Sequence, residues 1–82
     1  MPYVSNKSLR EALKRSEYSI KALAERAGRG ESSVRRDLGL KAGDYRYRDG
    51  KRYGPYRQEL ICEENALRYA EALNLDPIDL GF

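Results

Sequence analysis

The chain has 82 residues, of which 16 are Lys or Arg and 13 are Asp or Glu, so its net charge at pH 7 is +3. A chain of this length is expected to form a single small domain, residues 1–82, with a modest core. One cysteine and no histidine exclude an intramolecular disulfide, a His-dependent catalytic triad and a Cys/His zinc site. We therefore expect no enzyme activity, no metal site and no cofactor.

The charges are segregated along the chain. Residues 1–57 contain fifteen Lys or Arg and seven Asp or Glu, a net charge of +8, whereas residues 58–82 contain one Arg and six acids, a net charge of -5. This asymmetry is typical of a protein that binds phosphate groups on one side. Because the sequence has no run of eighteen apolar residues and no signal-peptide pattern, we expect a cytoplasmic, nucleoid-associated protein without membrane contact or a small-molecule ligand.

The first predicted helix follows a short lead, residues 1–5. Ser5 or Asn6 can cap it, and it is expected to end near Ser16. Three apolar residues at helical spacing form its inner face: Leu9, Ala12 and Leu13. We expect this helix to support the elements that follow it.

A second, shorter helix is predicted to begin after Ser19, whose hydroxyl can accept from the free amides of the first turn. Its apolar stripe consists of Ile20, Leu23, Ala24 and Ala27. Gly28 follows the last apolar residue and is expected to end the helix in a left-handed conformation.

A third helix is predicted from a cap at Gly30 or Ser32 to Leu38. Val34 and Leu38 lie four residues apart and form its apolar back. Its other face carries the candidate base-reading residues Glu31, Ser32, Arg35 and Arg36, with Ser33 beside them. Arg can donate two hydrogen bonds to guanine, a carboxylate can accept from cytosine, and Ser can serve either, so this face is suited to the major groove of DNA.

Residues 19–38 resemble the helix-turn-helix of Cro and lambda-repressor-like (XRE-like) proteins. The spacing of three residues in this segment is the spacing found in that family: Ala24, Gly28 and Val34. In the family, the small residue lets the two helices cross closely, the glycine makes the turn, and the aliphatic residue anchors the recognition helix. The resemblance implies a mainly α fold of about five helices that binds DNA. Arg29 and Asp37 depart from it, because these positions are usually apolar, and Ile20 stands where a phosphate-contacting Gln is common. A helical hairpin without DNA-binding function is the alternative.

Residues 39–57 form an insertion relative to that family. Asp49-Gly50 between alternating Tyr and Arg residues indicates a two-residue β-hairpin. The turn predicts three cross-strand pairs, which are Arg48 with Lys51, Tyr47 with Arg52 and Arg46 with Tyr53. The hairpin is interpreted either as an arm that touches DNA phosphates or a minor groove, or as a loop folded back on the domain with its Tyr rings over the core.

The C-terminal part, residues 57–80, is predicted to be helical. A helix is expected from Arg57 to Leu73, with Asn65 as a potential break, and Asn74 as a left-handed terminator. Asp76 and Pro77 then start a final helical turn. The rhythm of residues 67–80 again resembles the last two helices of the XRE-like family.

Other candidate contacts are assigned by charge and by position. Candidates for DNA phosphate or minor-groove contact are Ser19, Lys21, Arg29, Arg46, Arg48, Lys51 and Arg52. Leu80 and Phe82 are the candidate dimer contacts, because family members commonly bind inverted half-sites as symmetric dimers. Ile78 is expected to close the core of the monomer.

The sequence therefore predicts sequence-specific binding of double-stranded DNA by a homodimeric transcriptional repressor or regulator of phage, plasmid or bacterial type. Two alternatives remain. One is a protein-interaction module of antitoxin or antirepressor type, which is motivated by Arg29, Asp37 and the Tyr-rich insertion. The other is an architectural or recombination accessory protein that binds DNA without sequence preference.

Overall fold

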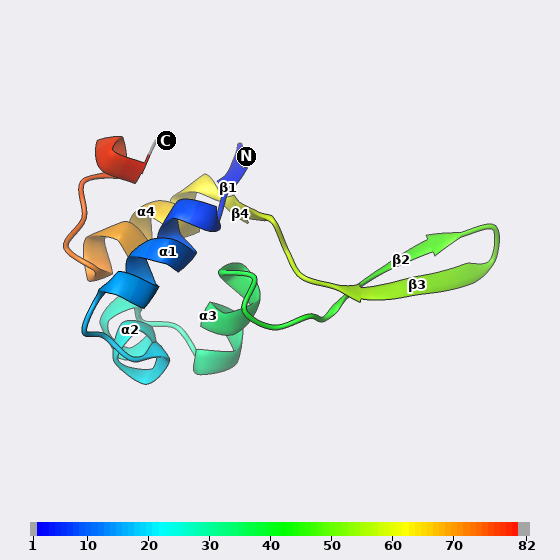
Figure 1. Cartoon of the computed structure of the whole chain (residues 1–82), viewed down its shortest axis with the longest axis horizontal. Coiled ribbons are helices and arrows are strands. Elements are labelled where there is room, and N and C mark those ends of the chain that lie inside the picture. Colours follow the sequence, from blue (N-terminus) through cyan, green and yellow to red (C-terminus); the bar gives the residue numbers. More distant parts are fainter. Residues whose placement is uncertain (1, 81–82) are drawn as a thin grey trace.

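A computed structural model describes residues 2–80, and it has an α+β fold with four α-helices, one 3-10 turn and two small antiparallel sheets (Figure 1). The elements in chain order are β1 (Tyr3–Ser5), α1 (Lys7–Arg15), α2 (Ile20–Ala27), α3 (Glu31–Asp37), β2 (Asp44–Arg48), β3 (Lys51–Tyr56), β4 (Leu60–Cys62), α4 (Glu63–Ala72) and the 3-10 turn η1 (Pro77–Leu80). The expectation of a mainly α domain of about five helices is therefore wrong.

The difference in fold class arises from the β1–β4 sheet. Strands β1 and β4 pair antiparallel, with Val4 opposite Ile61. The β-branched side chains of this pair favour extended backbone, and the partner strand is supplied from more than fifty residues away. Helix α4 consequently begins at Glu63, not near Arg57, and it continues through Asn65 without the predicted break.

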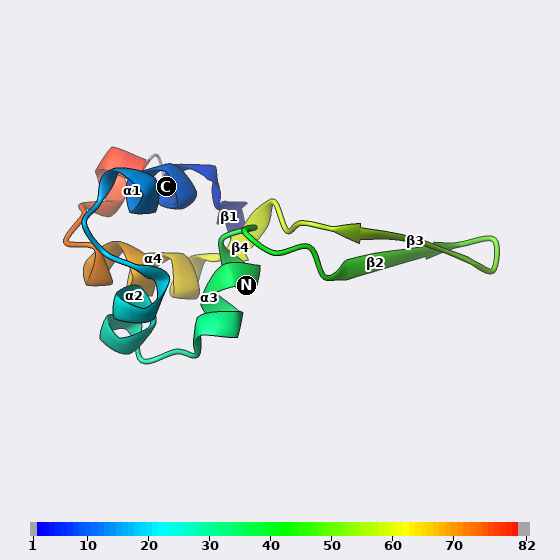
Figure 2. The same cartoon turned by 60° about the horizontal axis from the view of Figure 1, so that its bottom comes forward.

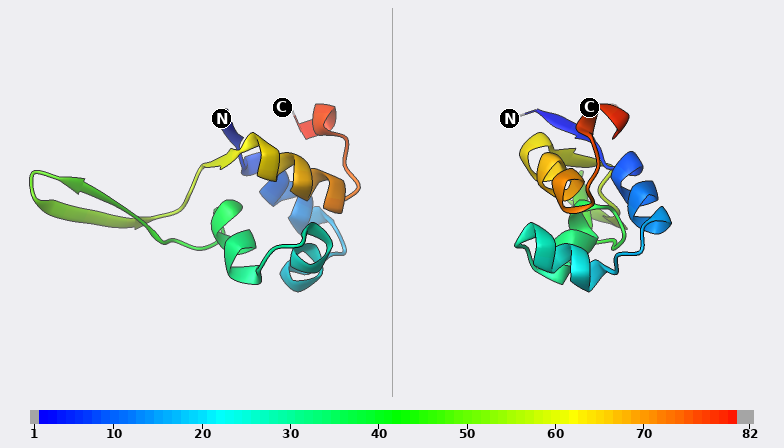
Figure 3. Two further views of the ribbon diagram at one scale, coloured as in Figure 1. Left: turned by 180° about the vertical axis from the view of Figure 1, so that it is seen from behind. Right: turned by 90° about the vertical axis from the view of Figure 1, so that its left-hand side faces the viewer.

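The core lies where the four helices meet β4 (Figure 3). The apolar stripes predicted for the first three helices are confirmed, because their central residues are buried there. The buried apolar residues are Leu9, Ala12, Leu13, Leu23, Ala24, Ala27, Val34, Leu38, Ile61, Ala66, Tyr69, Ala70, Ala72 and Leu73. No helix in residues 2–80 is both long enough and apolar enough to cross a membrane.

The helix ends follow the local sequence. The Ser19 hydroxyl accepts from the amide of Ala22 at 3.1 Å, so the predicted cap of α2 is confirmed. Gly28 and Asn74 adopt the left-handed conformation expected of them, with φ of 69° and 58°. Gly39, with φ of 70°, ends α3 in the same way. An added Cβ there would collide with the carbonyl of Gln58, so the chain can turn out of α3 only at a glycine.

Strands β2 and β3 form a hairpin, which we call the arm (residues 44–56). Its turn is Asp49-Gly50, both with positive φ, and the three predicted cross-strand pairs are confirmed. The arm projects from the helices and gives the molecule dimensions of 44 × 24 × 20 Å (Figures 1 and 2). Every arm residue after Asp44 is exposed, so the alternative in which its Tyr rings cover the core is wrong.

Candidate nucleic-acid interface

Helix α3 has an apolar back and a polar front. Val34 and Leu38 are fully buried against the core, and α3 packs against α2. Ser32 and Arg36 are exposed on the opposite side, and Glu31 is exposed at the first position of the helix. The packing of the two apolar residues therefore fixes which side of α3 faces solvent, as the sequence predicted.

Two further candidates on α3 are less accessible. Ser33 and Arg35 are half-buried, and an Nη of Arg35 lies 3.7 Å from a carboxylate oxygen of Glu31 one turn earlier. This exposed pair contributes little to stability. It does hold a cation and a carboxylate side by side at the edge of the polar front.

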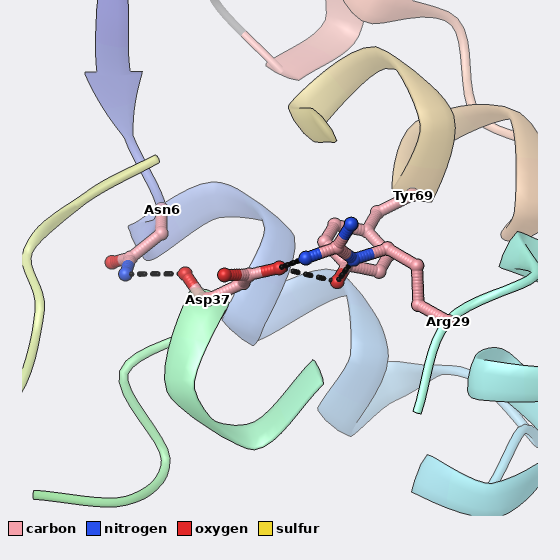
Figure 4. A network of polar contacts seen from close by, with 4 residues as sticks. All are labelled: Asn6, Arg29, Asp37 and Tyr69. Atoms are coloured by element: carbon pink, nitrogen blue, oxygen red, sulfur yellow. Dashed lines mark hydrogen bonds and ion pairs between the residues drawn. The ribbon is translucent and has the colours of Figure 1, made fainter. Parts of the chain in front are cut away.

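A polar network fixes α3 relative to α2 and α4 (Figure 4). The Asp37 carboxylate, at the end of α3, accepts the Tyr69 hydroxyl at 2.6 Å and lies 3.0 Å from an Nη of Arg29. Arg29 Nε donates in turn to the Tyr69 oxygen at 2.8 Å. The two charged residues in positions expected to be apolar therefore neutralise each other's charge: Arg29 and Asp37.

The network also corrects the interpretation of Arg29, which was expected to be an exposed turn residue available to phosphate. Its side chain is 26% exposed, and its guanidinium points inward to Asp37 and Tyr69. Sequence reasoning had no signal for this, because Tyr69 is 40 residues away in the chain.

Tyr69 is buried, and burial is the largest cause that raises the pKa of its hydroxyl. The hydrogen bond to Asp37 and the negative charge of that carboxylate raise the pKa further, while Arg29 lowers it. The hydroxyl therefore stays protonated at neutral pH and keeps donating to Asp37.

A second network, centred on the buried Asn6, fixes the base of the arm. Asn6 Nδ2 donates to the carbonyls of Asp37, at 3.0 Å, and Gln58, at 2.8 Å. Arg10 Nη1 donates to Asn6 Oδ1 and to the carbonyl of Leu38, both at 3.0 Å. One side chain at the start of α1 thus joins the end of α3 to the segment that follows the arm.

A hollow lies between the front of α3 and the segment that leads into the arm. It is lined by Ser32, Ser33, Arg36, Lys41 and Gly43. No carboxylate is among its lining residues, and the ion pairs in residues 2–80 involve neither of its cations. Two cations and two hydroxyls in one hollow are suited to a phosphate group. The sequence analysis missed Lys41, although its charge just after the third helix was a usable signal.

The basic residues of the arm divide into two groups. Arg46 and Arg52 stack on Tyr rings of the arm itself, with guanidinium carbons 4.8 Å and 4.7 Å from the ring centroids of Tyr56 and Tyr45. Arg48 and Lys51, which pair across the tip, are exposed and have no such stack. The two basic side chains of the arm without such a stack therefore lie at its tip.

The remaining candidates lie apart from these groups. Ser19 and Lys21 are exposed at the start of α2, where helix amides and dipole favour an anion. Phe82 lies outside the described residues, and the side chain of Leu80 is not described. Ile78 is 81% exposed, so the expectation that it closes the core is wrong. The Ile78 amide donates to Asp76 Oδ1 at 3.0 Å, as expected where Asp76 caps the final turn.

Comparison with protein-family models, curated proteins and solved structures finds no match to this chain.

Proposed function

We propose that this protein binds double-stranded DNA sequence-specifically, as a transcriptional repressor or regulator, with α3 in the major groove. The observation that carries the proposal is the two-sided character of α3. Its back is buried through Val34 and Leu38, while Glu31, Ser32 and Arg36 face solvent beside a basic hollow. A rigidly held helix with such a front is the element that reads base edges in this class of protein.

The residues divide into two roles. Glu31, Ser32, Arg35 and Arg36 are the base-reading candidates on the front of α3. Backbone phosphates are to be held by Lys21, at the start of α2, and by Lys41 with Ser33, at the hollow beside α3. Phosphate contacts fix the position of the helix on the duplex, and base contacts supply the specificity.

Recognition of a complete site calls for two copies. Seven residues of helix span only about 10 Å, which covers about three base pairs. We therefore propose a homodimer on an inverted repeat, as in the XRE-like family that residues 19–38 resemble. Leu80 and Phe82 remain the candidates for its contact. The β1–β4 sheet and the arm are additions to that family's pattern.

The alternative of a protein-interaction module has lost part of its support. It rested partly on Arg29 and Asp37, as charged residues that needed an outside partner. They form an ion pair of 3.0 Å with each other, and Tyr69 completes the network. The unusual charges are thus accounted for within the chain, which favours the DNA-binding function.

Chemical-shift mapping with a mixed-sequence duplex tests the proposal. We expect amide shifts in residues 31–36 and 41–43, together with an affinity that falls steeply as salt is raised. Residues 63–72, on the acidic half of the chain, serve as the internal control and are expected to stay unshifted. Shifts confined to α4, or no shifts with a folded protein at low salt, would contradict DNA binding through α3.

A further inference from the structure

The arm is a two-stranded ribbon with no core of its own. Every residue from Tyr45 to Tyr56 is exposed, including Tyr47 at 74%. A two-stranded hairpin is marginally stable in water by itself. The two Arg–Tyr stacks, one between Arg46 and Tyr56 and one between Arg52 and Tyr45, stiffen it from within. A stiffened, exposed arm is suited to contact a partner at a distance from the helices.

The charge of the arm indicates the chemistry of that partner. Arg48 and Lys51 are opposite each other at the tip, and like charges placed directly opposite destabilise a sheet. A polyanion between them removes this penalty. The acid next to them in the sequence, Asp49, lies in the turn with a φ of 52°, a left-handed conformation that Asp tolerates. Its presence at the tip is therefore explained by the conformation of the turn.

The length of the arm is close to half a helical turn of the duplex. Asp49, at the tip, lies six residue steps after Gly43, at the hollow beside α3, and an extended chain covers about 20 Å over that distance. One turn of B-DNA is about 34–36 Å, so a minor groove lies about 17 Å along the axis from the centre of a major groove. The arm also runs crosswise to α3 (Figures 1 and 2). The segment that leads into the arm lies beside the front of α3, so the crosswise orientation allows the arm to run along the duplex when the helix follows the major groove.

We propose that the tip of the arm enters the minor groove next to the major groove occupied by α3, where Arg48 and Lys51 select A·T pairs. This inference rests on the proposed function. The minor groove is only about 6 Å wide, and the strands of a sheet lie about 4.8 Å apart. The spacing is measured between strand axes, so a ribbon that also carries the bulk of two backbones and their side chains is too wide to lie flat in the groove, whereas two long side chains at its tip reach the floor.

Preference for A·T pairs follows from the groove itself. A·T tracts narrow the minor groove and strengthen its negative potential, which attracts inserted Arg and Lys. The amino group that guanine places in the minor groove obstructs the same approach. The tip residues thus determine the sequence preferred about half a turn outside the part read by α3.

The test uses duplexes that carry one site enriched from a random pool, with flanks of A·T, G·C or inosine·cytosine pairs. Inosine lacks the minor-groove amino group but keeps the major-groove face of guanine, so it separates the two grooves. We expect wild-type protein to bind the A·T and inosine flanks about fivefold or more tighter than the G·C flanks. Arg48→Ala and Lys51→Ala should each reduce that difference and still prefer the enriched half-site.

Lys14→Ala, in an exposed position of α1, is the matched control and should keep the full flank preference. Inosine flanks that behave like G·C flanks would overturn the inference, as would a flank preference unchanged in both tip variants. Tip variants that change the oligomeric state but not the flank preference would overturn it in favour of contact with a second copy. If wild-type protein prefers the enriched half-site but binds all flanks with equal affinity, this inference alone is overturned. If it binds no duplex at all, the proposed function is overturned as well.

Discussion

Replacing Arg29 by Leu tests whether the ion pair with Asp37 holds α3 in place. The substitution leaves the Asp37 carboxylate, 16% exposed, with the Tyr69 hydroxyl but without its cation. Breaking a buried pair costs about 3–5 kcal/mol, and breaking an exposed one about 0–1 kcal/mol. Because these side chains are 26% and 16% exposed, we expect an intermediate cost of about 2 kcal/mol. For a domain of this size that corresponds to a fall in Tm of about 10 °C.

Two companion variants separate the pair from the individual side chains. Asp37→Leu should cost less, about 1 kcal/mol, because the long Arg29 side chain can turn its charge into water. The double variant Arg29→Leu/Asp37→Leu restores the apolar character expected at these positions. It should be about 1–2 kcal/mol less stable than wild type. Replacing a whole ion pair by apolar residues is often neutral, but the buried Tyr69 hydroxyl loses both of its partners.

Urea denaturation followed by circular dichroism measures all four proteins. We expect the double variant to be clearly less destabilised than the sum of the two single changes, with a coupling free energy of about 1–3 kcal/mol. A double variant as unstable as that sum would refute the view that Arg29 and Asp37 compensate each other.

Three further outcomes are expected. Asn6→Ala removes the donor to the Asp37 and Gln58 carbonyls, so it should lower the free energy of unfolding by about 2 kcal/mol. It should also speed amide exchange in the segments on either side of the arm. Unchanged exchange in those segments would contradict the role of Asn6 in holding them. Burial and Asp37 raise the pKa of the Tyr69 hydroxyl, so its contribution to stability is fully present below the unfolded pKa of about 10 and is lost as the pH rises beyond it. Wild type should therefore lose more stability than Tyr69→Phe between pH 9 and 11. Parallel pH profiles of the two proteins would exclude this linkage. Arg36→Ala should weaken binding to an enriched DNA site by about 1–3 kcal/mol and binding to random DNA by less, as measured by fluorescence anisotropy, whereas an equal loss on both would remove Arg36 from base reading.

The parts of the fold that could be predicted from the sequence are those set by neighbouring residues. The Ser19 cap, the left-handed Gly28 and the Asp49-Gly50 turn each depend on a few adjacent positions, and each was confirmed. The β1–β4 sheet could not be predicted, because Val4 and Ile61 become neighbours only when the helices have packed. Without that partner, residues 60–62 resemble the first turn of the helix that follows them.

The candidate site divides in the same way. The front of α3 could be predicted, since the spacing of Val34 and Leu38 determines which residues face solvent. The role of Arg29 could not, because its partner Tyr69 comes from another helix far along the chain. Lys41 was missed for a related reason, as its place beside Arg36 depends on how the chain turns at the end of α3.

The most direct test of DNA reading by α3 is selection from a random duplex pool at physiological salt, with purified wild-type protein and the Arg36→Ala variant in parallel. We expect wild type to enrich an inverted repeat, and the variant to lose the preference at one position in each half-site. Enrichment of no sequence by folded wild-type protein would contradict sequence-specific binding, and an identical motif from both proteins would contradict base reading by Arg36.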